Sequence, residues 1–444
     1  MANEITKIPP KGNKKRIIIV GGGFAGLKFA RKLKKNKFQV ILLDRQNHHI
    51  FQPLLYQVAT SGVEPSAISF PFRKIFRKYK DFHLRMCEVN RVIPEYTRVE
   101  TSIGYLTYDY LIVSSGSHTN YFGNTKLPEQ TMSLKTTADA LYNRNKVLES
   151  LEEAQNTTDK QKRKQLMTYV IVGGGATGIE LAGALAEMRD YLFPQDYPDL
   201  DIKEMQIILL DAGPRLLSNF SEKSSEKVKE TLEKMGIEIR LNAQVKDYNC
   251  NSLMFVDGSQ LLSANVYWVA GVKGNSLEGF CKDNYGPGNR LLVNTYNQVK
   301  GYENIFALGD TALMITEEYP RGHPQVVQPA IQQAKHLAKN IERLRNGKEL
   351  KPFKYKDKGS MATIGRNNAI VEMKNLHFGG FLGWLSWLFI HLINIVGVKN
   401  KLFIVLDWTW SYLRYDPSLR LIIKPINKEK ENCLEGEQST EKVV

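Results

Sequence analysis

Hydrophobic positions follow the same order twice along this chain, once near the N-terminus and once in its middle. A run of mostly β-branched residues, Ile17 to Val20, leads into a glycine-rich turn, apolar residues then recur at helical spacing, and a second apolar run, Phe38 to Leu43, follows. The later copy has the run Tyr169 to Val172, another glycine turn, a helical pattern and then the run Met205 to Leu210. This order predicts a strand, a helix and a second strand in each copy, as in an α/β fold.

The glycines of both copies stand where a dinucleotide-binding turn needs them. Gly21 permits a tight turn, Gly23 lets the backbone approach a pyrophosphate, and Gly26 permits close packing of helix against strand. Phe24 and Ala25 complete this first loop at the start of the helix. The second loop carries the matching glycines: Gly173, Gly175 and Gly178. Because strands, glycines and helices occur in the right order, each copy predicts a Rossmann-like fold.

Each second strand ends in an acid, Asp44 in the first copy and Asp211 in the second. An acid at this position can bind ribose hydroxyls, and Asp211 also disfavours a 2′-phosphate because the next arginine is only at Arg215. The second site is therefore expected to prefer NADH over NADPH. Two dinucleotide folds predict two dinucleotides, usually FAD in the first fold and a pyridine nucleotide in the second, so that hydride can pass between them.

A charge-free stretch of 24 residues, 375–398, is long enough to cross a bilayer. Glycines at both ends shorten the expected helix to Trp384–Val396, and lysines flank the stretch on both sides without indicating a crossing direction. A second apolar run starts at Leu402 and includes Asp407. The pattern favours two segments on the membrane surface, with a spanning helix as the alternative. The predicted fold class is α/β, with two Rossmann-like dinucleotide-binding domains plus a C-terminal membrane-associating region.

Composition narrows the class of protein. With 444 residues the chain should form two or three domains. Its four cysteines form no closely spaced pair, which argues against a disulfide framework, a zinc site or a redox dithiol. No metal site is expected, because His48 and His49 have no third ligand at a suitable spacing. The N-terminus has no signal-peptide core, so a cytoplasmic start is expected.

The net charge of +15 is concentrated in residues 1–85, which contain 18 Lys and Arg against four acids. Such a surplus is typical of a solvated basic face, and it is equally compatible with attraction to anionic lipids or anionic cofactors. Nucleic acid is not expected as a partner, because no nucleic-acid motif accompanies the charge.

Taken together, these motifs resemble those of type II NADH dehydrogenases, the non-proton-pumping NADH:quinone oxidoreductases. The resemblance covers about residues 14–425 and rests on several stretches: VGGGFAGL, HHIFQPLLYQVATSGVEP, YDYLIVSSGSHTNYFG, VGGGATGIELAGALAE, WVAGV, NIFALGD, QPAIQQAKHLAKNI and MATIGRNNAIVEM. It implies FAD and NADH as cofactors and a membrane quinone, menaquinone or ubiquinone, as electron acceptor. An inner-membrane location on the cytoplasmic face follows from the same resemblance, which also allows a homodimer.

The resemblance also implies further cofactor contacts. NIFALGD should be a strand followed by a helix, with Gly309 and Asp310 holding the ribityl or pyrophosphate part of FAD; an acidic turn or helix cap is the alternative. Ser115 and Gly116 stand where the family usually has a threonine and a glycine. Three more expected cofactor contacts are Arg45, Gln57 and Gly271. Around Gln57, the segment PLLYQVATSG should either wrap the flavin ring or pack in the core.

Three residues are expected to take part in the chemistry. Glu180 should lie near the contact of nicotinamide and flavin, although a glutamate there is also favoured simply by the helix N-terminus. Gln328 and Gln332 match the two glutamines of the quinone-site helix and share one helix face, as two solvated glutamines would also do. Pro329 departs from the family pattern, and a helix tolerates it only near its start.

The expected domains are 1–115 for FAD (first part), 116–299 for NADH, 300–345 for FAD (second part, with the quinone-site helix), and 346–444 for membrane association or dimerisation, with a polar tail. The expected function is the passage of hydride from NADH to FAD and of two electrons to a quinone. One alternative is a redox sensor that binds FAD and NADH without rapid turnover. Another is a ferredoxin or sulfide:quinone reductase of the same superfamily, of which the sulfide type needs paired cysteines.

Overall fold

A computed structural model describes residues 3–5, 7–34, 37–374, 376–414 and 419–423. The polar tail, 427–444, lies outside these residues. The first fold is built on a parallel sheet with strand order β21-β9-β1-β2-β5. Its strands are β1 (Lys15–Val20), β2 (Phe38–Asp44), β5 (Phe82–Met86), β9 (Tyr110–Val113) and β21 (Ile305–Ala307). The two strands predicted around the first glycine loop are thus confirmed.

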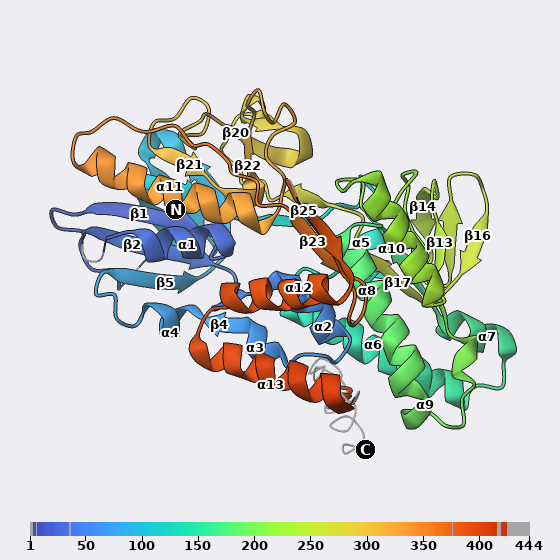
Figure 1. The fold of residues 1–444 in the computed structure, drawn as a ribbon. Helices are drawn as coiled ribbons and strands as arrows, with labels where there is room; N and C mark the ends of the chain where they lie inside the picture. The colour runs from blue at the N-terminus through green and yellow to red at the C-terminus, as the bar shows by residue number, and fades with distance from the viewer. Residues whose placement is uncertain (1–2, 6, 35–36, 375, 415–418, 424–444) are drawn as a thin grey trace, which may run out of the picture.

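Two helices cover one face of this sheet, α1 (Phe24–Lys32) and α11 (Val327–Arg345), and Figure 1 shows them side by side. Their apolar faces close a core that includes Ile17, Phe29 and Leu337, all fully buried. Burying side chains of this size stabilises the fold by roughly 1.5–3 kcal/mol each. The late segment 305–345 therefore returns to the fold that the N-terminus begins.

The second fold has the parallel strand order β13-β12-β11-β17. Its elements are β11 (Thr168–Val172), α8 (Ala176–Glu187), β12 (Gln206–Leu210), α10 (Glu222–Lys234), β13 (Glu238–Arg240) and β17 (Asn265–Trp268). It repeats the order of strand, glycine loop, helix and strand seen in the first fold, and the two Rossmann-like folds are confirmed. The domain boundaries at 115, 299 and 345 stay predictions.

The C-terminal part consists of an antiparallel sheet, β23 (Ser360–Thr363), β24 (Ala369–Met373) and β25 (Leu376–Gly379), followed by α12 (Gly380–Asn394) and α13 (Val398–Arg414). In Figure 1 the two helices lie below the sheet of the first fold and beside the second fold. Among the described residues, no helix combines the length and apolarity that crossing a membrane requires.

The prediction of a helix over Trp384–Val396 is wrong at both ends, since α12 begins at Gly380 and ends at Asn394. The glycines serve close packing rather than helix termination: a Cβ atom added at Gly383 would lie 2.9 Å from the carbonyl oxygen of Ala369 in β24, and one added at Gly379 would lie 2.7 Å from the same oxygen. Small residues here let the helix approach the sheet.

The helix expected directly after NIFALGD is absent from the described structure around Gly309. The chain instead makes a 3-10 turn, Gly309–Thr311, and enters β22 (Ala312–Met314). Gly309 has φ of +68° and its amide donates to Gln333 Oε1 at 2.8 Å. The helix that contacts this turn, through Gln333, is α11, which starts later in the chain. The contact is therefore made by tertiary packing and not by the adjoining sequence.

The remaining elements connect these parts. The helices are α2 (Leu55–Ala59), α3 (Pro65–Ile68), α4 (Phe72–Phe76), α5 (Leu127–Gln130), α6 (Thr137–Asn156), α7 (Lys160–Leu166) and α9 (Phe193–Asp196). The strands are β3 (His48–Ile50), β4 (Ser69–Pro71), β6 (Val89–Ile93), β7 (Arg98–Thr101), β8 (Gly104–Thr107), β10 (Ser117–Thr119), β14 (Val245–Tyr248), β15 (Ser252–Phe255), β16 (Gln260–Leu262), β18 (Val272–Gly274), β19 (Tyr285–Gly286) and β20 (Arg290–Val293).

Candidate functional site

The first glycine loop leaves space only where a pyrophosphate would need it. Gly21 has φ of +91°, and a Cβ atom there would lie 2.4 Å from the Ser114 carbonyl oxygen. A Cβ atom at Gly26 would lie 2.0 Å from the carbonyl oxygen of Gly21, so the third glycine packs directly on the first. At Gly23, by contrast, a Cβ atom would meet nothing within 4 Å. The open space therefore lies at the N-terminus of α1, where free amides favour an anion.

Asp44, at the end of β2, closes the same loop from the other side. Its carboxylate accepts hydrogen bonds from the amides of Gly22, at 2.6 Å, and Gln46, at 2.7 Å. Burial raises the pKa of Asp44, and the two amides partly oppose that shift. Each oxygen still has a lone pair for a ribose hydroxyl. The neighbouring Arg45 points into solvent, with 70% of its side chain exposed, and pairs with Glu88 at 3.8 Å.

Phe24 and His49 support the loop from beneath. The Phe24 ring packs edge-on against His49 at 5.1 Å and against Phe51 at 5.7 Å, while Ala25 is buried. His49 Nδ1 hydrogen-bonds the Gly22 carbonyl oxygen at 3.1 Å, and burial lowers the pKa of His49 to about 4. The ring is therefore neutral and can donate from Nδ1, which makes it a support for the loop backbone.

A second set of polar groups lies at the carboxyl ends of β9 and β21. Ser115 Oγ hydrogen-bonds Thr311 Oγ1 at 3.1 Å, and the Asp310 carboxylate accepts from Ser117 Oγ at 2.7 Å. Gly116 has φ of +71°, with no atom within 4 Å of a Cβ position. The carboxyl ends of parallel strands are where α/β folds bind ligands, so this set extends the glycine loop into one cradle that fits FAD.

The second glycine loop repeats the first closely. A Cβ atom at Gly173 would lie 2.6 Å from Ala270 Cα, and one at Gly178 would lie 1.9 Å from the Gly173 carbonyl oxygen. At Gly175, as at Gly23 in the first loop, an added Cβ atom would meet nothing within 4 Å. Asp211 accepts from the amides of Gly174 and Gly213, at 2.7 and 2.6 Å.

Gly271 follows β17 on the same side of the second sheet. It has φ of +140°, and its carbonyl oxygen accepts from the Asn120 amide at 3.0 Å. Together with the glycine loop it borders the space at the N-terminus of α8. This arrangement fits a second dinucleotide, NADH.

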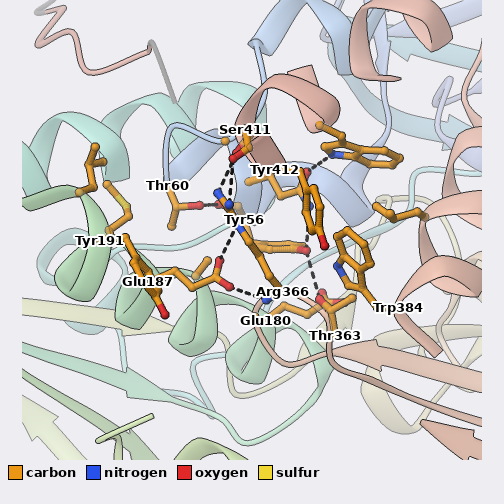
Figure 2. Close-up of a pocket in the computed structure, with 18 residues that line it drawn as sticks. Tyr56, Thr60, Glu180, Glu187, Tyr191, Thr363, Arg366, Trp384, Ser411 and Tyr412 are labelled. Atoms are coloured by element: carbon orange, nitrogen blue, oxygen red, sulfur yellow. Dashed lines mark hydrogen bonds and ion pairs between the residues drawn. The ribbon is translucent and has the colours of Figure 1, made fainter. Parts of the chain in front are cut away.

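A pocket lies between the second fold and the C-terminal helices, and Figure 2 shows its lining. Its walls come from α2, α8, β23, α12 and α13. Aromatic side chains dominate the C-terminal side: Trp384, Trp408 and Tyr412. Trp384 and Tyr412 stack with ring centres 5.5 Å apart, which fixes one end of the pocket.

Glu180 is the acid buried in this pocket, with 9% of its surface exposed. Burial raises the pKa of Glu180 to about 8, although the Thr363 backbone and the Trp387 side chain lower it in part. A carboxyl group with this pKa is mostly protonated at pH 7 and can donate a hydrogen bond or a proton. Beside it, the Tyr56 hydroxyl hydrogen-bonds Thr363 Oγ1 at 3.2 Å, and burial raises the pKa of Tyr56.

A second acid of α8, Glu187, links the pocket to α13. Arg366 donates its backbone amide to Glu187, and its guanidinium hydrogen-bonds Ser411 O at 2.8 Å and Ser411 Oγ at 2.9 Å (Figure 2). Burial raises the pKa of Glu187 to about 6, against the lowering effect of Arg366. Arg366 therefore joins helix α8 to helix α13 across the pocket.

Gln57 lies in this pocket rather than at a glycine loop. Its amide nitrogen donates to the Tyr56 hydroxyl at 3.0 Å, and its amide oxygen accepts from Trp408 Nε1 at 2.9 Å. Its predicted cofactor contact stays a prediction, and the structure adds a bond to a C-terminal helix that the sequence pattern did not suggest.

Gln328 and Gln332 stand near the start of α11, and Pro329 is accommodated in its first turn. Gln328 exchanges hydrogen bonds with Gly359 O, at 2.7 Å, and with the Lys358 amide, at 3.2 Å. Gln332 does the same with the backbone of Lys356, at 2.9 and 3.1 Å. Both side chains thus hold the segment 356–359, which leads directly into β23. Neither borders the pocket described above.

Four further residues belong to the cradle and were not singled out by sequence: Gln52, Lys135, Asn275 and Thr311. They lie in separate segments, so no local spacing indicates that they meet. Only the polar character of Gln52 inside an otherwise apolar run was visible in advance.

Comparison with known proteins gives matches over nearly the whole chain. Residues 15–334 match the model of the pyridine nucleotide-disulphide oxidoreductase family, and residues 358–414 match an NDH2 C-terminal domain. The type II NADH:quinone oxidoreductase Ndh of Mycobacterium tuberculosis is 35% identical over 425 residues, covering 92% of this chain and 90% of that protein. The corresponding Haemophilus influenzae enzyme is 30% identical over 390 residues, covering 81% of this chain and 87% of that protein.

Solved structures show the same fold. NDH2 from Plasmodium falciparum in complex with NADH matches with a TM-score of 0.85 at 20% identity, covering 93% of this chain and 100% of that chain. The sulfide:quinone oxidoreductase of Aquifex aeolicus matches less well, with a TM-score of 0.69 at 18% identity, covering 93% of this chain and 96% of that chain. The chain belongs to the pyridine nucleotide-disulphide oxidoreductases, and within them to the type II NADH:quinone oxidoreductases.

Proposed function

We propose that this NADH:quinone oxidoreductase reduces its quinone in the pocket between α2, α8 and the C-terminal helices. The enzyme uses FAD and NADH, and bound flavin supplies the chemistry that accepts hydride and releases two electrons. The first fold fits FAD and the second fits NADH, because each glycine loop is open only at its helix N-terminus.

The observation that carries this proposal is the carboxyl group of Glu180, which is buried in this pocket next to the Tyr56 hydroxyl. Reduction of a quinone takes up protons as well as electrons, and a carboxylic acid with a pKa near the working pH is well suited to donate one. The Tyr56 hydroxyl lies in the same pocket and stays protonated, so it can donate a hydrogen bond to a carbonyl oxygen. The wall on the side of the C-terminal helices is mostly aromatic or aliphatic, with Trp384, Leu388, Trp408 and Tyr412, which suits a flat, uncharged ring.

Gln328 and Gln332 remain proposed quinone-site residues. The hydrogen bonds seen here support a positioning role, because the segment 356–359 that they hold continues into β23, where Thr363 lines the pocket.

We propose further that α12 and α13 rest on the membrane that contains the quinone. Large apolar side chains, each at least 43% exposed, gather on these two helices: Phe381, Leu382, Leu385, Phe389, Ile393, Leu402, Phe403, Leu406, Trp410 and Leu413. We call this set the apolar docking surface. So many exposed apolar groups on two adjoining helices mark an interaction surface. Lipid is the proposed occupant, because the substrate dissolves in it and tryptophans border the surface.

Basic residues beside this surface favour anionic lipid. The Asn400 amide at the start of α13 donates to the carbonyl oxygens of Ser66 and Ala67 in α3, from which the chain continues into α4. Arg73 and Lys74 are exposed on α4. Each such cation near an anionic surface contributes about 1 kcal/mol. Docking on the cytoplasmic face of the inner membrane is proposed on this basis, and a homodimer stays a prediction that light scattering can test.

A pocket-filling variant tests the quinone site. Ala184 in α8 lines the pocket, and Ala184→Phe should slow reoxidation of flavin by a short-chain quinone while flavin reduction by NADH stays at the wild-type rate. Stopped-flow absorbance separates the two half-reactions. Glu226→Phe on the exposed side of α10 is the control for a surface phenylalanine. Equal reoxidation rates in Ala184→Phe and wild type would rule out this pocket.

Vesicle sedimentation tests the docking surface. The double variant Leu382→Asp and Leu406→Asp should remain in the supernatant with vesicles that retain the wild type, because two charges would enter the lipid interface. Vesicles with and without anionic phosphatidylglycerol separate the apolar from the electrostatic contribution. Binding of the double variant equal to that of wild type would contradict the assignment.

A further inference from the structure

Lys135 has a rigidly fixed main chain next to the cradle of the first fold. Its amide donates to Asp139 Oδ2 at 2.9 Å, and its carbonyl oxygen accepts from Gln52 Nε2 at 3.1 Å. The next residue, Thr136, forms a capping box with Asp139 at the start of α6. A capped helix and a cross-link to another loop leave the position of Lys135 with little freedom.

The side chain of Lys135 reaches back toward the carboxyl end of β21. Its Nζ donates to Ser117 Oγ at 3.2 Å, and Ser117 Oγ donates to Asp310 Oδ2 at 2.7 Å. Burial lowers the pKa of Lys135, while the carboxylates of Asp310 and Asp139 raise it in part. The ammonium group is therefore held in a largely desolvated place by two hydrogen bonds in series.

The ammonium group has donors to spare. It carries three N–H groups. Within the described residues it forms one hydrogen bond, to Ser117, and no ion pair closer than 4 Å. Lysine is seldom buried unless it is paired. A half-buried cation with unused donors points to a ligand with negative charge or carbonyl oxygens.

The surroundings indicate which ligand this is. Gly309, next to Asp310, lies close to Ala25 of the first glycine loop, since a Cβ atom added at Gly309 would be 3.4 Å from Ala25 Cβ. Ser117 follows directly on Gly116, whose neighbourhood is open, and Gln52 lies in the loop that leads to α2. The Lys135 ammonium thus borders the FAD cradle between its two halves.

We propose that Lys135 is a cofactor-contacting cation that donates to the bound FAD and stabilises its reduced form over its oxidised form. The inference rests on FAD binding in the first fold. Uptake of hydride adds negative charge to the flavin, and a nearby cation favours that state, which raises the reduction potential. Ser117 is a positioning residue, since its hydroxyl links the ammonium to the Asp310 carboxylate.

The test compares midpoint potentials of purified holoproteins. Lys135→Met should weaken the binding of reduced relative to oxidised flavin about tenfold, the size of one charge-assisted hydrogen bond, which lowers the two-electron midpoint potential by about 30 mV. Lys135→Arg keeps the charge and should restore most of the potential. Lys126→Met, an exposed lysine with the same loss of charge, is the matched control and should leave the potential unchanged.

Ser117→Ala keeps the experiment decisive if Lys135→Met loses its flavin. It should shift the potential in the same direction by a smaller amount, because the ammonium loses its anchor but keeps its charge. A melting temperature that falls in Lys135→Met while the potential stays at the wild-type value would show a purely structural lysine and overturn the proposal. Failure of NADH to bleach the wild-type flavin would refute the proposed function instead, so the two failures are distinguishable.

Discussion

Helices α1 and α8 occupy the same place in the two dinucleotide folds, and each begins at a glycine loop whose third glycine touches the first. Two residues beyond that third glycine, the first helix carries Lys28 and the second carries Glu180. The same backbone scaffold thus presents a basic side chain in one fold and an acidic side chain in the other at equivalent positions.

The neighbours of each helix determine what that position does. Lys28 lies where α1 packs against α11; burial and the charges of Lys335, Arg31 and Lys32 lower its pKa. Glu180 lies where α8 packs against α2 and β23, enclosed by the pocket. In the proposed function, the first helix only holds a dinucleotide, whereas the second also supplies the acid of the quinone pocket. The comparison teaches that a fold repeat sets the binding geometry and that tertiary packing sets the chemistry.

The largest expected effect comes from the glycines that both folds share. Gly26→Ala and Gly178→Ala each place a Cβ atom about 2 Å from a carbonyl oxygen, so each loop must move. Gly26→Ala should purify without flavin, while Gly178→Ala should keep its flavin and lose ~100-fold or more in kcat/KM for NADH. Flavin content by absorbance and steady-state kinetics check this. Loss of flavin from Gly178→Ala alone would reverse the assignment of the two folds.

Gly23→Ala and Gly175→Ala serve as controls for folding. Nothing lies within 4 Å of either Cβ position, so both proteins should keep the wild-type melting temperature without ligand. Each variant should still bind its own dinucleotide more weakly, because the added methyl group enters the space that the pyrophosphate would occupy.

The variant Glu180→Gln tests whether the two helices differ in function. Loss of a general acid typically costs about 100-fold or more in rate, so quinone reduction should fall by that order while flavin reduction by NADH changes little. Lys28→Gln, at the equivalent position, should leave both half-reactions near wild type. Stopped-flow measurement of each half-reaction gives the answer. A loss in the NADH half-reaction alone would place Glu180 at the nicotinamide instead.

The pH dependence of stability tests the raised pKa of Glu180 directly. The pKa of Glu180 is raised from 4.5 to about 8, so between these values the folded protein binds more protons than the unfolded chain. Its unfolding free energy should therefore fall as pH rises through this window, by up to ~1.4 kcal/mol for each pH unit. Glu180→Gln should flatten the slope in chemical denaturation at several pH values. An unchanged slope would show that Glu180 titrates normally.

The sequence predicted the parts of the site that are local. Lys15 to Asp44 contains a strand, a glycine loop, a helix and a second strand in that order, and the spacing of the glycines is a direct consequence of backbone geometry. The second copy was predictable for the same reason, apart from one residue at the start of each strand: β11 begins at Thr168 and β12 at Gln206.

The pocket could not be predicted, because its walls are brought together only by the fold. Glu180 lies in a helix whose sequence gives no sign of Trp384 or Tyr412, which line the same pocket from the C-terminal helices. Gly383 was interpreted as a helix terminator, since sequence shows its flexibility but not the Ala369 carbonyl oxygen that it approaches. Lys135 was missed for a similar reason: its anchor Ser117 is in another segment.

The smallest expected effect concerns Gln328 and Gln332, which connect the helix of the first fold to the pocket beside the second. If they act by holding segment 356–359, each change to Ala should lower the unfolding free energy by about 1 kcal/mol, the size of an ordinary hydrogen bond, and raise KM for quinone only modestly through β23. Lys339→Ala, exposed on the same helix, is the matched control. If instead they contact quinone, KM or kcat should change by tenfold or more with little loss of stability. Denaturation and quinone kinetics on the same two variants therefore decide whether α11 contacts the substrate or only holds the segment that leads into β23. The hydrogen bonds to Gly359 and Lys356 favour the holding role.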